Sequence, residues 1–344
     1  VTGCYTELDE EKIRDIDPSV EIFKNHEKDR IINRISPKTK KLTLNPGGRA
    51  RPFVKIQEGC SHRCSYCIIP ALRGRPKSRT VEDIVEEVLM YEQAGYDEVV
   101  LTGIHIGLYG IDLKRKTNLT GLLESVLKKT SRVRLRLSSL EVIEIDEEFL
   151  EVFSDARVCK HLHIPLQSGS ESVLKRMKRP YNTMRYERVV KEIHKRFSNI
   201  SLGTDIIVGF PGETDKEFEE TLRFIEGVPI NYMHIFPYSD RPGTEASLMG
   251  NKVPASIKKQ RAKRLRRLDK SRREKYIEAQ IGKTLEVLAE TVAEEGLIKG
   301  KSENYLDVFF EDTEFRPGKI YKVKILGYSE KGLKGKAFKK DKTL

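Results

Sequence analysis

The sequence lacks any apolar run long enough to cross a membrane. No stretch of its 344 residues approaches the ~18 consecutive apolar residues of a transmembrane helix, and no signal peptide opens the chain. Hydrophobic residues make up only 38%, but thirteen Phe and thirteen Tyr argue against disorder. The length corresponds to two or three domains of about 150 residues each. We therefore expect a folded, cytoplasmic protein with no membrane partner.

Cysteine is also scarce, which excludes a secreted scaffold built on disulfides. Three of the five cysteines lie close together, as Cys60-x3-Cys64-x2-Cys67. Three thiolates on one loop can hold three irons of a [4Fe–4S] cluster. No fourth ligand lies nearby, because His62 sits too close to its neighbours in the loop. The pattern predicts a cluster with one open coordination position for a substrate or cofactor.

Zinc and a disulfide fit the cysteine loop less well than an iron–sulfur cluster does. A structural zinc site normally needs a second cysteine pair, which the sequence does not contain. A disulfide would leave one of the three cysteines unexplained. Zinc remains the main alternative to iron and sulfur.

Positive charge is concentrated in two segments. The formal net charge of the chain is +12, and residues 256–278 and 315–344 each carry a net charge of +8. The remainder is therefore mildly acidic. A Lys-rich surface of the kind found in thermophiles would spread both signs evenly. Segregated basic blocks favour a polyanionic partner, above all a nucleic acid.

Strand and helix patterns alternate from Arg51 onward. Strands are expected at 53–56, 98–102, 132–138, 161–166, 201–208 and 232–237. Helices are expected at 81–94, 119–129, 146–153, 171–177, 184–197 and 215–226. This alternation predicts an α/β fold whose parallel sheet is open or curled into a partial barrel, with ligands bound where the strands end.

The two ends of the chain follow different patterns. A short helix at 7–16 and a Lys-rich loop ending at Gly48 precede the α/β region. A basic helix is expected at 256–278. Short strands at 284–288, 297–300, 305–310 and 320–326 then predict a small antiparallel β-barrel, a fold that often binds nucleic acid.

The cysteine loop, with Tyr66 before its last cysteine, resembles the radical S-adenosylmethionine (SAM) signature. Four later segments are similar to the methylthiotransferase family: Arg73–Arg79, Pro165–Ser170, Thr204–Glu213, and His234–Ser239 with Arg241–Thr244. The C-terminal barrel resembles a TRAM domain, an RNA-binding module. The resemblance implies a partial (β/α)6 barrel and four regions: a remnant of the N-terminal methylthiotransferase domain plus linker at 1–50, a radical SAM domain at 51–255, a connecting helix at 256–280 and a TRAM-like barrel at 281–344.

The resemblance also implies an activity. Leu101–His105 with Gly107, and Arg136–Glu141, are most similar to the branch that acts on N6-threonylcarbamoyladenosine in tRNA. Such an enzyme places a methylthio group on carbon 2 of adenosine 37, in the anticodon stem-loop, through a 5′-deoxyadenosyl radical. It requires SAM, the [4Fe–4S] cluster and an electron donor. Sister branches act on isopentenyladenosine 37 or on an aspartate of a ribosomal protein, and a non-catalytic iron–sulfur RNA-binding protein is the further alternative.

The first residues depart from the family pattern. The family carries a second [4Fe–4S] cluster on three N-terminal cysteines, and Val1-Thr-Gly-Cys4 resembles the segment with the last of them. The other two have no counterpart here, so we expect a fragment or a truncated variant with an incomplete auxiliary site. The remaining cysteine, Cys159, is expected to be a buried apolar thiol.

Five further residues are expected to contact SAM or the substrate. Tyr66 lies where the family's backbone touches the SAM adenine, and Gly103 would let the methionine end of SAM approach the backbone. Glu141 and Gln167 follow strand ends, where they could hydrogen-bond a ribose or the substrate. Asp205 is a carboxylate inside an apolar strand, which would be costly without a role.

The remaining polar candidates receive weaker assignments. Three histidines, His105, His161 and His163, are expected to lie in loops or the core with their hydrogen bonds satisfied. They are not expected to act as ligands. Residues that could anchor either SAM or a tRNA phosphate are Arg73, Ser78 and Arg79. Residues 209–213 lack the Lys-Ser/Thr of a phosphate-binding loop, so they are expected to form a strand exit and a helix start.

Overall fold

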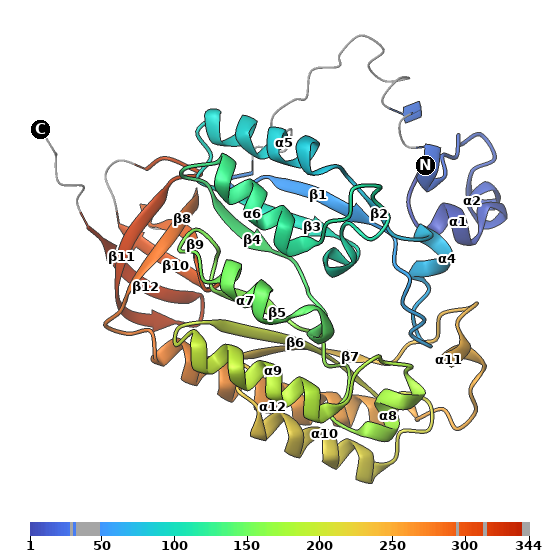
Figure 1. Ribbon diagram of the computed structural model, residues 1–344. Helices are drawn as coiled ribbons and strands as arrows, with labels where there is room; N and C mark the ends of the chain where they lie inside the picture. The colour runs from blue at the N-terminus through green and yellow to red at the C-terminus, as the bar shows by residue number, and fades with distance from the viewer. Residues whose placement is uncertain (28–29, 32–48, 294–295, 312–314, 339–344) are drawn as a thin grey trace, which may run out of the picture.

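The computed structural model describes residues 1–27, 30–31, 49–293, 296–311 and 315–338. Its centre is a set of parallel strands in two groups (Figure 1). The first group is β1 (Phe53–Glu58), β3 (Glu98–Gly103) and β4 (Arg134–Leu137), with the short antiparallel β2 (Lys77–Ser78) at its edge. The second is β5 (His161–His163), β6 (Ser201–Val208) and β7 (Tyr232–Pro237).

The two groups meet between β4 and β5. Leu135 forms a parallel bridge with Val158, and the Leu140 N–H donates to the His163 carbonyl at 3.0 Å. The six parallel strands therefore curl into the expected partial (β/α)6 barrel, which is loosely closed at this seam.

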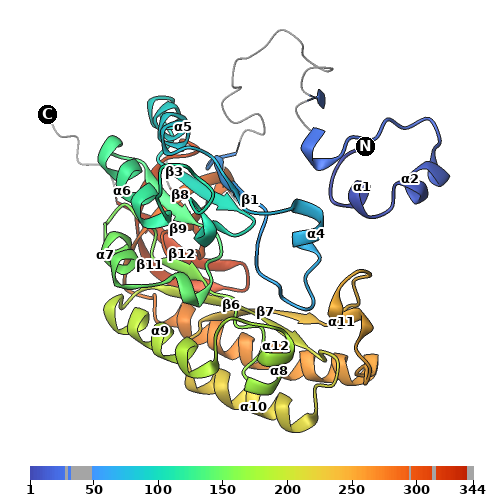
Figure 2. The same ribbon diagram turned by 45° about the vertical axis from the view of Figure 1, so that its right-hand side comes forward.

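Helices cover the outer face of the partial barrel (Figures 1 and 2). They are α5 (Val81–Gln93), α6 (Leu119–Lys129), α7 (Glu147–Phe153), α8 (Glu171–Arg176), α9 (Thr183–Arg196) and α10 (Asp215–Gly227). Side-chain oxygens cap most of these N-termini, as where Thr80 accepts the Asp83 N–H and Thr214 accepts the Glu217 N–H. The apolar faces pack on the strands and form one continuous core. Among the described residues, no helix is both long and apolar enough to span a membrane.

Short helices lie around the open end of the strands. They are the 3-10 turns η2 (Ile106–Leu108) and η3 (Val142–Glu144), with α4 (Ile69–Arg73) after the cysteine loop and α11 (Glu245–Leu248) after β7. At the N-terminus, the helix expected at 7–16 is broken into α1 (Tyr5–Leu8) and α2 (Glu10–Ile16), because the Asp9 side chain accepts the Lys12 N–H and starts a new helix. The turn η1 (Asn25–Glu27) follows, and the Asn25 side chain donates to the Leu72 carbonyl. Most of the expected Lys-rich linker lies outside the described residues.

After the long helix α12 (Ala255–Glu278), the chain forms a closed five-stranded barrel. Its strands are β8 (Thr284–Val292), β9 (Ile298–Ser302), β10 (Asp307–Glu311), β11 (Ile320–Ser329) and β12 (Gly332–Ala337). The expectation of an antiparallel barrel from four strands was incomplete. Strand β12 was missed because its sequence is rich in Gly and Lys, and it closes the barrel by pairing parallel to β10.

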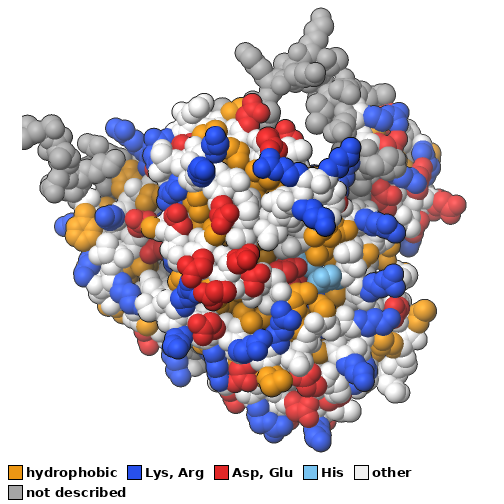
Figure 3. Space-filling model, viewed as in Figure 1, with side chains coloured by type: hydrophobic (Ala, Val, Ile, Leu, Met, Phe, Trp, Pro, Cys, Tyr) orange, Lys and Arg blue, Asp and Glu red, His pale blue; other side chains and the backbone are white. Residues whose placement is uncertain are grey.

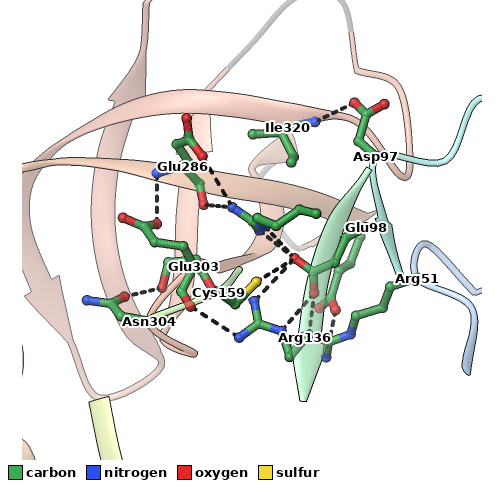
Figure 4. Close-up of polar contacts among 12 residues, drawn as sticks. Arg51, Asp97, Glu98, Arg136, Cys159, Glu286, Glu303, Asn304 and Ile320 are labelled. Atoms are coloured by element: carbon green, nitrogen blue, oxygen red, sulfur yellow. Dashed lines mark hydrogen bonds and ion pairs between the residues drawn. The ribbon is translucent and has the colours of Figure 1, made fainter. Parts of the chain in front are cut away.

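The C-terminal barrel docks against the N-terminal ends of the parallel strands through a buried ionic network (Figure 4). Glu98, with no exposed surface, accepts hydrogen bonds from the guanidinium groups of Arg134 and Arg136 at 2.8 and 2.7 Å. Their other nitrogens reach the C-terminal barrel, where Arg134 donates to the Glu286 carbonyl and Arg136 to the Ser302 carbonyl. The two barrels therefore share one set of buried charges, and the opposite end of the parallel strands is left open for chemistry.

Candidate functional site

The cysteine loop follows β1 at the open end of the partial barrel. Gly59 has φ +75° and a Cβ there would lie 2.2 Å from the Arg75 carbonyl oxygen, so the turn into the loop requires glycine. Within the loop, the Cys60 N–H donates to the Gly74 carbonyl at 3.1 Å and the Cys67 N–H to the Cys64 carbonyl at 3.0 Å. The three cysteines are unbridged and partly exposed. Backbone bonds thus fix a loop whose thiols remain available for ligation.

A buried arginine that the sequence reasoning missed lies beside this loop. One nitrogen of Arg179 is 3.1 Å from Cys64 Sγ and 3.4 Å from the Tyr66 hydroxyl, while the other pairs with Glu141. Arg179 is 115 residues from Cys64 in sequence, and only the turn after α8 brings it here. It links a cluster cysteine to two of the residues expected to contact SAM.

A cavity of about 240 Å³ opens next to Tyr66. The same cavity is lined by Gln167 and Asp205, so three of the five expected contacts meet there. Its other lining residues are Ile207, Phe236, Pro237, Tyr238, Ser239 and Arg241. Glu141 reaches this group through Arg179, whereas Gly103 does not line the cavity. An apolar wall with a few convergent polar groups is typical of a small-molecule site.

Two of the expected residues also have structural roles. Gln167 has φ +68° and is buried, with its N–H donating to the Asp205 carbonyl and its carbonyl accepting the Ile207 N–H. These two hydrogen bonds to β6 therefore hold Gln167 in its left-handed backbone conformation, next to the cavity. At Gly103, a Cβ would lie 2.7 Å from the Gln57 carbonyl oxygen, so packing against β1 already explains the glycine.

The other candidates are engaged within the protein. His105 contacts Cys60 Sγ at 3.3 Å through Nδ1 and pairs with Glu144 through Nε2, and His161 bonds the Tyr232 hydroxyl. Partners from within the chain also hold the three candidates for SAM or phosphate anchoring: Glu58 for Arg73, the Gly110 N–H for Ser78 and Glu87 for Arg79. Residues 209–213 form the exit of β6, where the Glu213 side chain accepts the Gly209 N–H.

The three cysteines fit an iron–sulfur cluster. Burial raises the pKa of the Cys64 and Cys67 thiols, although Arg179 partly opposes this effect. Free thiols here are protonated at neutral pH, so cluster binding must release their protons and the iron must hold them as thiolates. The cysteines are partly exposed and an arginine lies beside Cys64, which suits a cluster of negative charge.

Comparison with known proteins agrees with this chemistry. A profile of the radical SAM superfamily matches residues 54–225. The threonylcarbamoyladenosine tRNA methylthiotransferase MtaB of Thermotoga maritima is 37% identical over 350 residues, which cover 97% of this chain and 80% of that protein. The chain belongs to the radical SAM methylthiotransferase family. The MtaB protein of Aquifex aeolicus is 42% identical over 80% of this chain, and the tRNA-2-methylthio-N(6)-dimethylallyladenosine synthase of Bacillus subtilis is 38% identical over 81%.

Two further findings define the extent of these likenesses. The methylthiotransferase-family chain spans 65% of the Aquifex relative and 55% of the Bacillus one. Among solved structures, the cobalamin-dependent SAM radical enzyme OxsB with aqua-cobalamin and SAM bound has a TM-score of 0.52 at 14% identity, covering 80% of this chain and 43% of its own. That likeness shows the fold alone.

The N-terminal segment of this family member places Cys4 near the cysteine loop. The Arg73 Nε donates to Cys4 Sγ at 3.2 Å, and Arg73 also pairs with Glu58 at the end of β1. Cys159 lies elsewhere, buried beside Glu98 at the interface between the barrels. Burial raises the pKa of Cys159 to about 12, so its thiol is a poor ligand.

Part of the positive charge on α12 is engaged by other groups of the chain. Arg261 is buried against Glu213 and Asp215, Arg264 pairs with Glu219, and Arg272 donates to backbone carbonyls at the end of α10. On the face seen in Figure 3, basic and acidic side chains are interspersed. A second set of α12 cations is exposed and has no ion-pair partner in the part of the chain described: Lys259, Lys263, Arg266 and Arg267.

Proposed function

We propose that this chain is the catalytic and RNA-binding part of a tRNA methylthiotransferase that modifies carbon 2 of N6-threonylcarbamoyladenosine 37. The observation that carries the proposal is the loop of Cys60, Cys64 and Cys67 beside a polar-lined cavity at the open end of the partial barrel. The names of relatives at 37–42% identity support the substrate branch.

The residues around the cavity would hold SAM and orient it. Tyr66, Gln167 and Asp205 line the space next to the cysteines, and Glu141 is fixed beside Cys64 by Arg179. When bound, the cluster supplies the electron that cleaves SAM, with an external electron donor as its source. The protein's share is to fix the positions of the reactants and to keep water out. Gly103 would contribute by close approach of its backbone to the methionine end of SAM.

The tRNA anticodon stem-loop would be bound by two elements outside this cavity. One is the exposed cationic face of α12, and the other is the C-terminal barrel, which we propose to be a TRAM-like RNA-binding domain. The barrel carries Lys322, Lys334 and Lys336 on its exterior, and Tyr328 and Phe338 are exposed on it. Cations that contact phosphates and aromatic rings that stack on bases suit single-stranded RNA.

Cys4 would be one ligand of an auxiliary [4Fe–4S] cluster. Its contact with Arg73 places it next to the helix that follows the cysteine loop. Because no further N-terminal cysteine is present in the sequence, this chain should hold only the first cluster. Anaerobic iron analysis should give about four iron atoms per chain, and about eight would contradict the proposal.

Mass spectrometry of tRNA nucleosides from cells with and without the intact gene tests the reaction. We expect loss of 2-methylthio-N6-threonylcarbamoyladenosine and accumulation of its precursor without the methylthio group. Loss of the methylthio derivative of isopentenyladenosine would instead assign the sister branch named by the Bacillus relative. An unchanged tRNA profile would overturn the proposal and leave a ribosomal-protein substrate or a non-catalytic RNA-binding role. Replacing the gene by one that encodes Cys64→Ser separates these two alternatives. A ribosomal-protein methylthiotransferase would lose its modified aspartate, because the reaction needs the cluster, whereas a non-catalytic RNA-binding protein has no product to lose.

A further inference from the structure

A second group of metal-ligating side chains lies inside the partial barrel, on strands that do not carry the cysteines. His163 ends β5, Asp205 lies in β6 and His234 lies in β7. The strands are adjacent and parallel, with Asp205 paired in register with His234 and His163 with Gly203. One ligand atom from each of the three side chains lies within 4.8 Å of the others.

The contacts within this group leave a nitrogen unsatisfied. Nδ1 of His163 bonds the Ser139 hydroxyl at 2.8 Å. Its Nε2 is buried and has no hydrogen-bond partner in the described structure, although Asp205 Oδ1 is only 3.1 Å away. His163 is 8% exposed, so water does not readily compensate this atom. A buried imidazole nitrogen that lies 3.1 Å from a carboxylate oxygen without a well-directed hydrogen bond is an arrangement that a shared metal ion would satisfy.

The other two members give the group access to solvent. Nδ1 of His234 lies 3.2 Å from the same Asp205 oxygen, and the His234 side chain is 51% exposed. Asp205 also lines the cavity beside Tyr66 and Gln167. An ion could therefore enter from the cavity. Asp205 Oδ1 faces both imidazoles, which leaves Oδ2 for the cofactor contact proposed above.

We propose that His163, Asp205 and His234 form a binding site for one divalent transition-metal ion. Two imidazoles and one carboxylate suit Zn²⁺, Fe²⁺, Co²⁺ or Mn²⁺, whereas Ca²⁺ and Mg²⁺ prefer oxygen ligands alone. Ser139 fits as the outer partner that orients the His163 ring, as is usual for metal-bound histidine. Three protein ligands leave coordination positions open toward the cavity, where an oxygen-bearing group of a substrate could bind.

The first test measures Co²⁺ binding to a chain without the cysteine loop's thiols. In a Cys60→Ala, Cys64→Ala, Cys67→Ala background, Co²⁺ is titrated under anaerobic conditions and followed by its visible absorption. We expect one saturable site without the thiolate charge-transfer band that a cysteine ligand would give. Adding Asp205→Asn or His234→Gln should weaken binding at least tenfold. Adding Ser139→Ala should weaken it about tenfold, the lower end for an outer partner.

The test includes a control variant and a second protein preparation, the latter for the case that the triple-alanine chain does not fold. His194 is an exposed histidine on α9, so His194→Gln should leave the affinity unchanged. If the triple-alanine chain does not fold, as judged by circular dichroism, Mn²⁺ binding to the cluster-loaded wild-type chain is measured by equilibrium dialysis and elemental analysis. Mn²⁺ is counted separately from cluster iron. Absence of saturable 1:1 binding, or binding that Asp205→Asn and His234→Gln leave unchanged, overturns the site. Neither result bears on the tRNA product, so this proposal and the proposed function fail independently.

Discussion

Replacing Glu98 by glutamine should disrupt the interface between the two barrels. The carboxylate of Glu98 is the shared partner of Arg134 and Arg136, and Arg51 lies 3.8 Å from it. All of Glu98 is buried, and both arginine side chains are 3% exposed. The Glu98→Gln change keeps the size of the side chain but removes its charge. Arg136 would then remain buried without an anionic partner, and Arg134 would keep only the more distant Glu286 carboxylate at 3.7 Å.

The size of the effect follows from the proton affinity of Glu98. Burial alone would raise the pKa of this carboxyl, but Arg136 and Arg134 outweigh burial and lower it from 4.5 to about 2. At neutral pH that difference corresponds to about 3 kcal/mol of folding free energy. Removing one member of a buried ion pair typically costs about 3–5 kcal/mol. We therefore expect Glu98→Gln to lower the free energy of unfolding by about 3 kcal/mol.

Urea unfolding followed by far-ultraviolet circular dichroism measures this loss, since the chain has no Trp for fluorescence. The folded pKa lies below the unfolded one, so the contribution is complete above pH 4.5 and declines as the pH falls toward 2. The wild-type and Glu98→Gln stabilities should therefore converge over this window. Glu82→Gln is the control, because Glu82 is 73% exposed and 3.7 Å from Arg115, and it should change stability by less than about 1 kcal/mol. A Glu98→Gln loss below about 1 kcal/mol at pH 7, or one that does not vary with pH, would refute the reasoning.

Three further predictions concern the site, the RNA surface and the buried thiol. Arg179→Lys keeps a charge but loses the planar fork that reaches Cys64 and Glu141, so 5′-deoxyadenosine formation from SAM should fall about 10–100-fold; an unchanged rate would argue against this role. Lys263→Ala with Arg266→Ala should weaken tRNA binding and make the slope of log affinity against log salt shallower by about 1.4, measured by fluorescence anisotropy; an unaltered slope would exclude these cations. In a variant whose other four cysteines (Cys4, Cys60, Cys64 and Cys67) are replaced by alanine, the Cys159 thiol, with its pKa raised to about 12 by burial, should react with Ellman's reagent at pH 8 only after unfolding, and rapid labelling of that folded variant would contradict its placement.

The sequence pattern predicted those strands whose residue pattern is contained in one continuous stretch of the chain. The strands expected at 201–208 and 232–237 match β6 and β7 in their bounds. The strand expected at 161–166 stops at His163 in the structure. Pro165 offers no N–H and Gln167 turns to positive φ, so the apolar run continues beyond the regular strand. Strand β12 was missed for the opposite reason, since it has Leu333 as its deeply buried side chain among Gly and Lys.

The site was predictable only where its residues are neighbours in sequence. The spacing of Cys60, Cys64 and Cys67 is a local feature, and it indicated the cluster directly. Arg179 comes from a distant turn, and sequence alone gives no reason to bring it to Cys64. The approach of His163 to His234 likewise depends on strand register across the crossovers between β5, β6 and β7. Site residues that share one loop can be predicted from the sequence. Site residues that come from different strands of the barrel can be found only in the folded structure.

The two faces of α12 show why net charge alone overstates the RNA-binding surface. The helix segment 256–278 carries a net charge of +8, yet Arg261 and Arg272 are used to hold α10 and the exit of β6. Those cations are partly or wholly buried, so they would not contact tRNA phosphates. They would therefore release no counterions from the RNA on binding. The exposed set of Lys259, Lys263, Arg266 and Arg267 would be accessible to phosphates in the proposed complex. At about −0.7 per phosphate contact for a single strand, four such contacts would give this helix a salt slope of about −2.8, where eight would give about −5.6. The same helix therefore packs against the partial barrel with its inner charges and, in the proposed complex, would contact tRNA phosphates with its outer ones.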